Sequence, residues 1–87
     1  MLNRVPVQEE TVSTVCAYIK NEVHGQMLGK GPGAFVGDHE ALGAITEEYH
    51  ELVEAVRSNN GRNITHELTD LAAACVFALA SRIEETE

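Results

Sequence analysis

Two short runs of acidic residues carry the side chains best suited to chemistry. The first, at residues 47–51, reads EEYHE, and the second, at residues 67–70, reads ELTD. Residues three apart lie on the same side of a helix, so each run presents a pair of carboxylates in one direction. The two pairs are Glu48 with Glu51 and Glu67 with Asp70. Four oxygen ligands on two facing helices predict a site for a hard divalent cation, Mg²⁺ or Mn²⁺.

The setting of the second run argues against an acidic face that is merely solvated. Glu67 and Asp70 lead directly into LAAACVFALA at residues 71–80, the most apolar stretch of the chain. Partly buried carboxylates must be paired, protonated or bound to a metal. The nearest cations in sequence, Arg57 and Arg62, are poorly placed for pairing. Two like charges about 4 Å apart repel by about 4 kcal/mol at an effective dielectric constant of about 20, so we expect a cation among these acids.

The chain before the acidic runs is expected to form one helix and a connector. A helix is predicted from about Pro6 to His24, because proline suits a first turn and apolar residues recur every three or four positions. Gly25 is its expected stop. The segment that follows, up to Gly37, is rich in glycine and contains a proline, which excludes a stable helix there.

The acidic runs lie on two further predicted helices. The first begins after Asp38, a good N-cap, and continues to about Ser58. The sequence NNG at residues 59–61 predicts a tight turn, so the next helix, from about Asn63 or Ile64, folds back antiparallel. This last helix is apolar on all sides after Asp70, and such a helix is buried all round. The fold class is therefore all-α, a single domain over residues 1–87 with three main helices, in a bundle completed by dimerisation or by a dimer of dimers.

Composition narrows the partners and the compartment. The 87 residues carry a net charge of −8 with only six lysines and arginines, too few for a basic face that binds a nucleic-acid polymer. No signal core is visible at the start, and no stretch approaches the roughly 20 apolar residues of a membrane span. Cys16 and Cys75 sit in apolar helical surroundings and are predicted to be buried free thiols. These features predict a cytoplasmic protein without membrane partners.

An acidic protein can bind a phosphorylated small molecule where metal ions stand between the two sets of negative charge. The segment GKGPG at residues 29–33 lacks the spacing of a phosphate-binding P-loop, and no strand pattern precedes it. Lys30 within it is a candidate phosphate contact. The chain has no tryptophan, and the candidates for stacking on a base are Tyr18, Tyr49 and Phe35, although the two tyrosines are expected in the core.

Together the two runs resemble the signature of the MazG-type all-α nucleoside triphosphate pyrophosphohydrolases, EExxE followed after a short helical hairpin by ExxD. The resemblance covers roughly residues 38–82. It implies that Mg²⁺ is held by four acids, namely Glu48, Glu51, Glu67 and Asp70. It also implies catalytic roles for Glu47 and Glu48, with Glu47 behind the metal shell or orienting the attacking water. The implied reaction splits a (deoxy)nucleoside triphosphate into the monophosphate and pyrophosphate, in a homodimer or homotetramer.

One departure from this family concerns the nucleotide. Related proteins often place an amide or a tyrosine on the helix after ExxD, whereas here residues 71–80 are apolar and Arg82 is the first polar group with reach. Arg82 is therefore a second candidate contact to the substrate. The sequence therefore does not predict which base or which sugar the substrate carries.

Three alternatives stand beside this interpretation. Phosphoribosyl-ATP pyrophosphohydrolases share the acidic layout but usually show a lysine shortly before the double glutamate, where this chain has Ala44-Ile45-Thr46. A di-iron carboxylate protein would use Glu47-x-x-His50, although Asp70 stands where its second histidine is needed. An acidic helical dimerisation module without catalysis would show no effect of Mg²⁺ on thermal stability.

Overall fold

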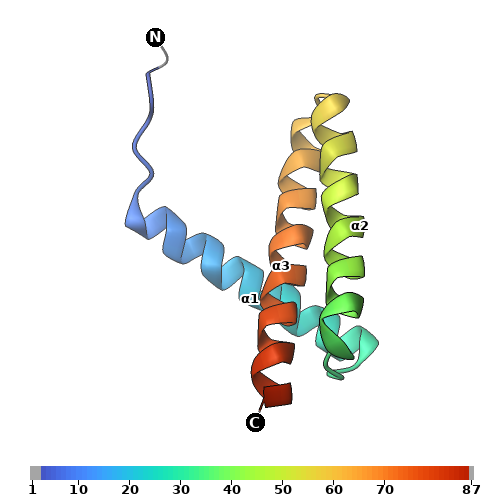
Figure 1. Ribbon diagram of the computed structural model, residues 1–87. Helices are drawn as coiled ribbons and strands as arrows, with labels where there is room; N and C mark the ends of the chain where they lie inside the picture. The colour runs from blue at the N-terminus through green and yellow to red at the C-terminus, as the bar shows by residue number, and fades with distance from the viewer. Residues whose placement is uncertain (1–2, 87) are drawn as a thin grey trace.

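The computed structural model describes residues 3–86, and these residues form three α-helices and no strand. The helices are α1 (Glu9–Lys30), α2 (Gly37–Arg57) and α3 (Gly61–Thr86) (Figure 1). The all-α fold class is thus confirmed. Of the expected domain, residues 1, 2 and 87 lie outside the described residues.

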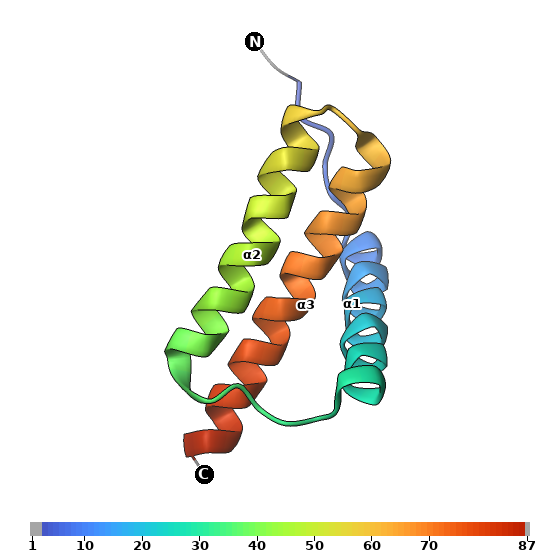
Figure 2. The same ribbon diagram turned by 90° about the vertical axis from the view of Figure 1, so that its right-hand side faces the viewer.

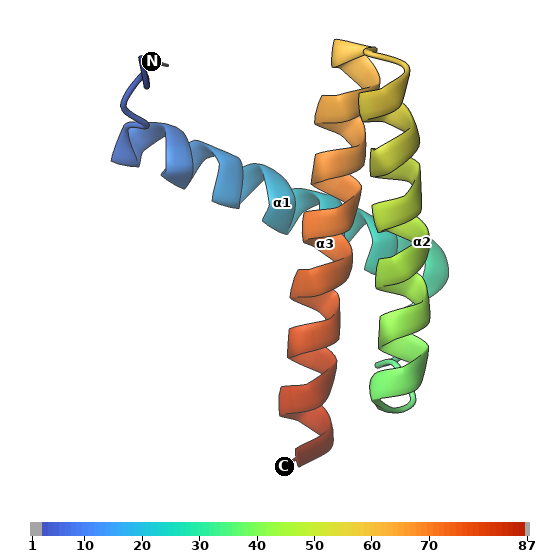
Figure 3. The same cartoon turned by 45° about the horizontal axis from the view of Figure 1, so that its top comes forward.

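Helices α2 and α3 form an antiparallel hairpin, as the NNG turn predicted, and α1 crosses α3 steeply (Figures 1 and 3). At the turn Asn59 has φ 54°, a left-handed conformation that asparagine tolerates better than most residues. The Asn60 Oδ1 accepts a hydrogen bond from the Asn63 N–H at 3.2 Å and caps α3. This cap lets α3 begin at Gly61, slightly earlier than predicted.

The expected end of the first helix at His24 is wrong. Helix α1 continues through Gly25 and Gly29, because a glycine inside a helix costs only about 1 kcal/mol. It ends at Lys30, and the next residue, Gly31, has φ 96° and donates its N–H to the Met27 carbonyl oxygen at 2.9 Å. Several glycines in this segment could end the helix, and the sequence pattern indicated Gly25 instead of Gly31.

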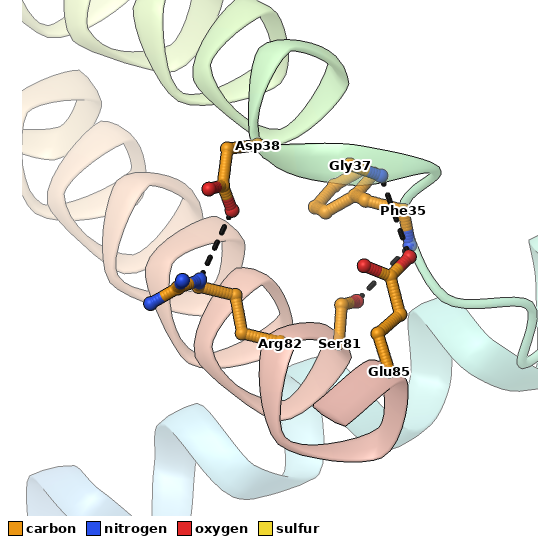
Figure 4. A network of polar contacts seen from close by, with 6 residues as sticks. All are labelled: Phe35, Gly37, Asp38, Ser81, Arg82 and Glu85. Carbon is orange, nitrogen blue, oxygen red and sulfur yellow. Dashed lines mark hydrogen bonds and ion pairs between the residues drawn. The ribbon is translucent and has the colours of Figure 1, made fainter. Parts of the chain in front are cut away.

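The segment between α1 and α2 is fastened to the C-terminal end of α3 (Figures 2 and 4). The Phe35 N–H donates to Ser81 Oγ at 3.0 Å, and the Gly37 N–H donates to Glu85 Oε1 at 3.3 Å. The Arg82 Nε lies 3.0 Å from the Asp38 Oδ1. Asp38 is thus inside the first turn of α2 and engaged with α3, so its predicted role as N-cap is wrong.

The interior of the hairpin is built from small side chains. The buried apolar residues are Ala41, Ala55, Ala73 and Ala78, and no large side chain among the described residues is fully buried. Alanines on facing helices let the helix axes approach closely, which brings polar groups on neighbouring positions together as well. The single chain therefore has little apolar core of its own.

Several residues expected in the core are exposed in the single chain. Cys16 and Cys75 are both exposed, and Tyr18 and Tyr49 are 63% and 57% exposed. Among the described residues, helices α1 and α2 each contact α3 but not each other, and α3 keeps one flank uncovered, so every helix retains an exposed side. The chain exposes 7170 Å², whereas a self-contained monomer of this length exposes about 5,000 Å².

Helix α3 bears on the expectation that no stretch of the chain resembles a membrane span. Its stretch Gly61–Glu85 is long and apolar enough to cross a bilayer by length and composition, with a mean hydropathy of 1.2. However, Glu67 and Asp70 lie inside it, and the uninterrupted apolar part, residues 71–80, spans only about 15 Å of helix. The hydrocarbon core of a bilayer is about 30 Å thick, so this apolar segment is too short to span it.

The first testable consequence concerns Ala73, which is fully buried in the hairpin. Replacing Ala73 by leucine should lower the free energy of unfolding by about 1–3 kcal/mol, because the added carbons have no space. Urea unfolding measures the change. The matched variant Ala17→Leu lies on the exposed surface of α1 and should change stability by less than about 0.5 kcal/mol. Equal effects of the two substitutions would contradict the described packing.

Candidate functional site

The α2–α3 hairpin brings the two acidic runs together. One ligand atom each from Glu48, Glu51 and Glu67 lie within 4.8 Å of one another. Asp70 forms a second such group with Glu67 and His66. The two groups share Glu67, so the four acids selected from the sequence meet at one place. Their geometry offers a divalent cation several carboxylate oxygens at once.

Burial distinguishes this cluster from a solvated acidic surface. Glu48 and Glu67 are half-buried, and the Oε2 atom of each is buried without a hydrogen-bond partner among the described residues. An unsatisfied buried polar group costs about 1–3 kcal/mol, and a charged one costs more. A cation bound between these oxygens would remove that cost. The donor set, all carboxylate, fits Mg²⁺ or Mn²⁺.

The electrostatics of the cluster also favour a bound cation. Burial raises the pKa of Glu48 above its ordinary value, and the negative charges of Glu51 and Asp70 raise it further. Burial also raises the pKa of Glu67, and the neighbouring carboxyl of Glu51 raises it further. A raised pKa favours the protonated carboxyl group, so protons compensate part of the negative charge when no cation is bound.

Asp70 lies where α1 and α3 meet. Burial raises the pKa of Asp70, the neighbouring His66 opposes this, and the charges of Glu22 and Lys30 act from α1 in opposite directions. The side chain of Asp70 is 20% exposed, and its Oδ2 lies 3.2 Å from the His66 Nε2. Helix α1 therefore contributes to the electrostatic environment of the acids although it carries none of the motif.

A cavity of about 320 Å³ opens beside the acids. Glu47, Glu48 and Asp70 line one part of it. Another part is apolar and includes Phe35 and Phe77, whose rings make an edge-to-face contact with centroids 5.2 Å apart. The remaining wall comes from the last turns of α1, with Gln26, Met27 and Lys30. This volume falls within the range of small-molecule sites, and its lining joins acids, an apolar surface and a cation.

The continuation of α1 beyond Gly25 is what gives the cavity this wall. Lys30, selected from the sequence as a phosphate contact, lies on it. Arg82, the other selected contact, does not line the cavity and pairs instead with Asp38. Glu47 is exposed and lies on the cavity wall next to Glu48.

Sequence reasoning missed three residues at this site. Phe77 lies seven positions after Asp70, two helical turns along the same face, so the helix period could have identified it. Gln26 was not predicted, because the sequence pattern assigned its segment to a non-helical connector. His66, one turn before Asp70, could have been found from the same spacing.

Two other polar residues of α2 stand outside the cluster. Glu54 pairs with Arg57 at 3.9 Å on the exposed surface, as expected of a solvated acid. His50 takes part in neither ligand group within residues 3–86. Within these residues, the single chain therefore does not bring Glu47 and His50 together with the other acids as a di-iron site would require.

The raised pKa values predict how stability depends on pH without metal. Glu48, Glu67 and Asp70 bind protons more tightly in the folded chain than in the unfolded chain. The stabilisation from these protons is complete below the ordinary values, 4.5 for glutamate, and is lost as the pH rises through the raised values. We expect the free energy of unfolding in a chelator to fall as the pH is raised from about 4 to 7, as measured by urea unfolding.

The variant Glu67→Gln isolates the cause of this loss. It should stabilise the metal-free protein at pH 7 by about 1–2 kcal/mol and should reduce the rise in Tm that Mg²⁺ produces. Glu54→Gln, which changes an exposed acid on the same hairpin, should leave both quantities as they are. A metal-free protein whose stability increases over this pH range would contradict the described cluster.

Comparison with known proteins agrees with this geometry. A family model described as the MazG nucleotide pyrophosphohydrolase domain matches residues 37–87, from the first residue of α2 onward, so it includes both acidic runs. No curated protein and no solved structure gives a significant match. The family implies hydrolysis of a phosphoric anhydride and the use of a divalent metal. The match covers more than half of the 87 residues. The chain therefore belongs to the MazG nucleotide pyrophosphohydrolase family.

Proposed function

We propose that this chain is a Mg²⁺-dependent pyrophosphohydrolase that cleaves a ribo- or deoxyribonucleoside triphosphate to the monophosphate and pyrophosphate. The observation that carries the proposal is the pair of buried, unpartnered oxygens on Glu48 and Glu67, at the edge of a cavity large enough for a small ligand. A purely structural hairpin would have no reason to keep such oxygens without partners.

The metal would be held by the four clustered acids, Glu48, Glu51, Glu67 and Asp70. When bound, the ion offsets the charge of the acids and of the polyphosphate and polarises a phosphoryl oxygen. Mn²⁺ takes oxygen ligands as well and is expected to replace Mg²⁺.

Glu47 is the residue we assign to the attacking water. It is exposed on the cavity wall beside Glu48, so a water can reach it while a phosphate lies against the cluster. In the proposed step the water oxygen adds to one phosphorus of the α–β anhydride, and the bridging P–O bond breaks. Glu47 accepts the proton of the water, and the group on the other side of the broken bond leaves with its electrons. The leaving group is pyrophosphate when the water adds to the α-phosphorus and the monophosphate when it adds to the β-phosphorus. Glu48, the next residue on α2, holds the reacting groups in position.

The rest of the cavity supports a nucleotide as the substrate. Lys30 supplies a positive charge near the phosphates, which a chain of net charge −8 otherwise lacks there. Phe35 and Phe77 offer an apolar aromatic surface for the base, and the Gln26 amide can both donate and accept hydrogen bonds. The hydrogen bond from the Phe35 N–H to Ser81 holds this aromatic wall in place. Arg82, paired with Asp38, remains a predicted contact only for a substrate that displaces Asp38.

Self-association is part of this proposal, because the exposed surface exceeds that of a self-contained monomer by about 2,000 Å². The radius of gyration of 14.8 Å also exceeds the value of about 12 Å expected for a compact domain of this length. The exposed apolar residues of α3 include Val76, Leu79 and Ile83. An excess of this size matches what obligate homodimers bury.

The central prediction of the proposed function concerns products. Incubation with a panel of nucleoside triphosphates and Mg²⁺ should release pyrophosphate and the monophosphate for at least one nucleotide. Glu48→Gln and Asp70→Asn should each lower kcat/KM by at least about 100-fold, since each removes a charge that the transition state needs. Glu54→Gln serves as the matched control. Release of orthophosphate alone, or full activity in both site variants, would sink the assignment. Phosphoribosyl-ATP in the panel tests the related alternative.

The predicted homodimer has its own measurement. Light scattering after size exclusion should give at least twice the mass of one chain, and Leu79→Glu should shift it towards one chain, because a carboxylate cannot be buried unpaired in an apolar interface. Leu79→Met keeps the apolar surface and should keep the assembly. A wild-type protein that stays monomeric at about 100 μM would refute this part of the proposal.

A further inference from the structure

His66 stands beside the acidic cluster without any role in the motif. It lies one helical turn before Asp70, and its Nε2 is 3.2 Å from the Asp70 Oδ2. One ligand atom each from His66, Glu67 and Asp70 lie within 4.8 Å of one another. The second group of ligands, Glu48, Glu51 and Glu67, contains only carboxylates. The cluster thus has a side that contains nitrogen and a side that contains only oxygen, with Glu67 on both.

A surface ion pair alone does not account for this arrangement. The His66 side chain is 66% exposed, and exposed pairs of this kind add little to stability. The buried Glu67 Oε2, in contrast, has no hydrogen-bond partner within the described residues, so the pair between His66 and Asp70 leaves this oxygen unsatisfied. A single ion touching all three side chains would satisfy it.

The spacing of the donors suits such an ion. Two ligands at about 2.1 Å from a metal and at right angles to each other lie about 3.0 Å apart. The distance of 3.2 Å between the His66 nitrogen and the Asp70 oxygen is close to this value. The two donors come from one helix at positions i and i+4, a spacing that places metal ligands on a common face. Little movement is therefore needed to convert this contact into joint ligation.

The nature of the donor determines the preferred ion. Mg²⁺ prefers oxygen ligands and keeps several waters, whereas an imidazole nitrogen suits first-row transition metals. We propose that His66 is a metal ligand and that, with Glu67 and Asp70, it forms a position that prefers Mn²⁺ or a similar transition ion over Mg²⁺. This inference rests on the proposed function only in taking the clustered carboxylates as ligands. Mg²⁺ would occupy the side formed by Glu48 and Glu51.

Pulsed electron paramagnetic resonance of bound Mn²⁺ tests the inference without any use of activity. At about pH 8, where free imidazole is neutral, the wild-type protein with substoichiometric Mn²⁺ should show the ¹⁴N coupling of a directly bound imidazole. His66→Gln should abolish the coupling and weaken Mn²⁺ binding roughly tenfold, with Mg²⁺ binding changed less than about twofold. His50→Gln is the matched control, since His50 is exposed and adjoins Glu51, and it should keep the coupling.

A second variant guards against loss of folding. His66→Glu keeps a ligand but replaces nitrogen with oxygen, so it should bind Mn²⁺ without ¹⁴N coupling and with a reduced preference for Mn²⁺ over Mg²⁺. Helical circular dichroism checks that each variant is folded. Absence of ¹⁴N coupling in the wild type, or its persistence in His66→Gln, would overturn the proposal.

Measurements of Mn²⁺ binding to the carboxylate variants distinguish a failure of this inference from a failure of the proposed function. If Mn²⁺ binds without nitrogen coupling and the binding is lost in Glu67→Gln and Asp70→Asn, the carboxylate site stands and the assignment of His66 fails. If Mn²⁺ binding is unchanged in these two carboxylate variants, the acids are not the metal site, and the proposed function fails with it.

Discussion

Mutual repulsion among carboxylates held within a few ångströms of one another governs this structure. Glu48, Glu51 and Glu67 converge within 4.8 Å because α2 and α3 pack closely through alanines. Each like-charged pair at such a distance opposes folding by about 4 kcal/mol, against a total stability of about 5–15 kcal/mol for a typical domain. Protons or a cation among the acids would therefore stabilise the closed hairpin. The proposed metal would thus contribute to the stability of the fold as well as to the chemistry.

Helix α1 connects the acidic cluster to the proposed substrate site and the proposed assembly. One end of α1 reaches the cavity with Gln26 and Lys30, where Lys30 would supply a cation for the proposed polyphosphate substrate. Its preceding turns face an apolar groove of about 600 Å³ shared with Val76 of α3. A second chain that covers the uncovered flank of α3 would fix the orientation of α1 and thereby the wall of the cavity. Proposed dimerisation and proposed substrate binding are thus mechanically linked through one helix.

The sequence predicted the parts of the site that follow from helical periodicity. The i,i+3 spacing of Glu67 and Asp70 and the NNG turn together indicated which acids meet, and the structure brings them together. Features set by competition between local signals were not predictable in this way. Gly25 and Gly31 are equally good stops in sequence, and the helix passes the first and ends before the second. Cys75 is exposed because no described element of the single chain covers it. Phe77 and His66 share a helix face with Asp70 and could have been predicted from helical spacing, but neither belongs to the acidic motif.

The most direct measurement of the central claim is anomalous X-ray scattering from crystals grown with Mn²⁺ and a nucleotide whose α–β bridge cannot be hydrolysed. The account predicts an anomalous peak within ligand distance of the Glu48 and Glu67 oxygens that lack partners in the metal-free chain, with the phosphates on the side of Lys30. Those two oxygens should then be about 2.0–2.3 Å from the ion. A fully loaded crystal with no peak at these carboxylates, or with the nucleotide bound elsewhere on the chain, would contradict it.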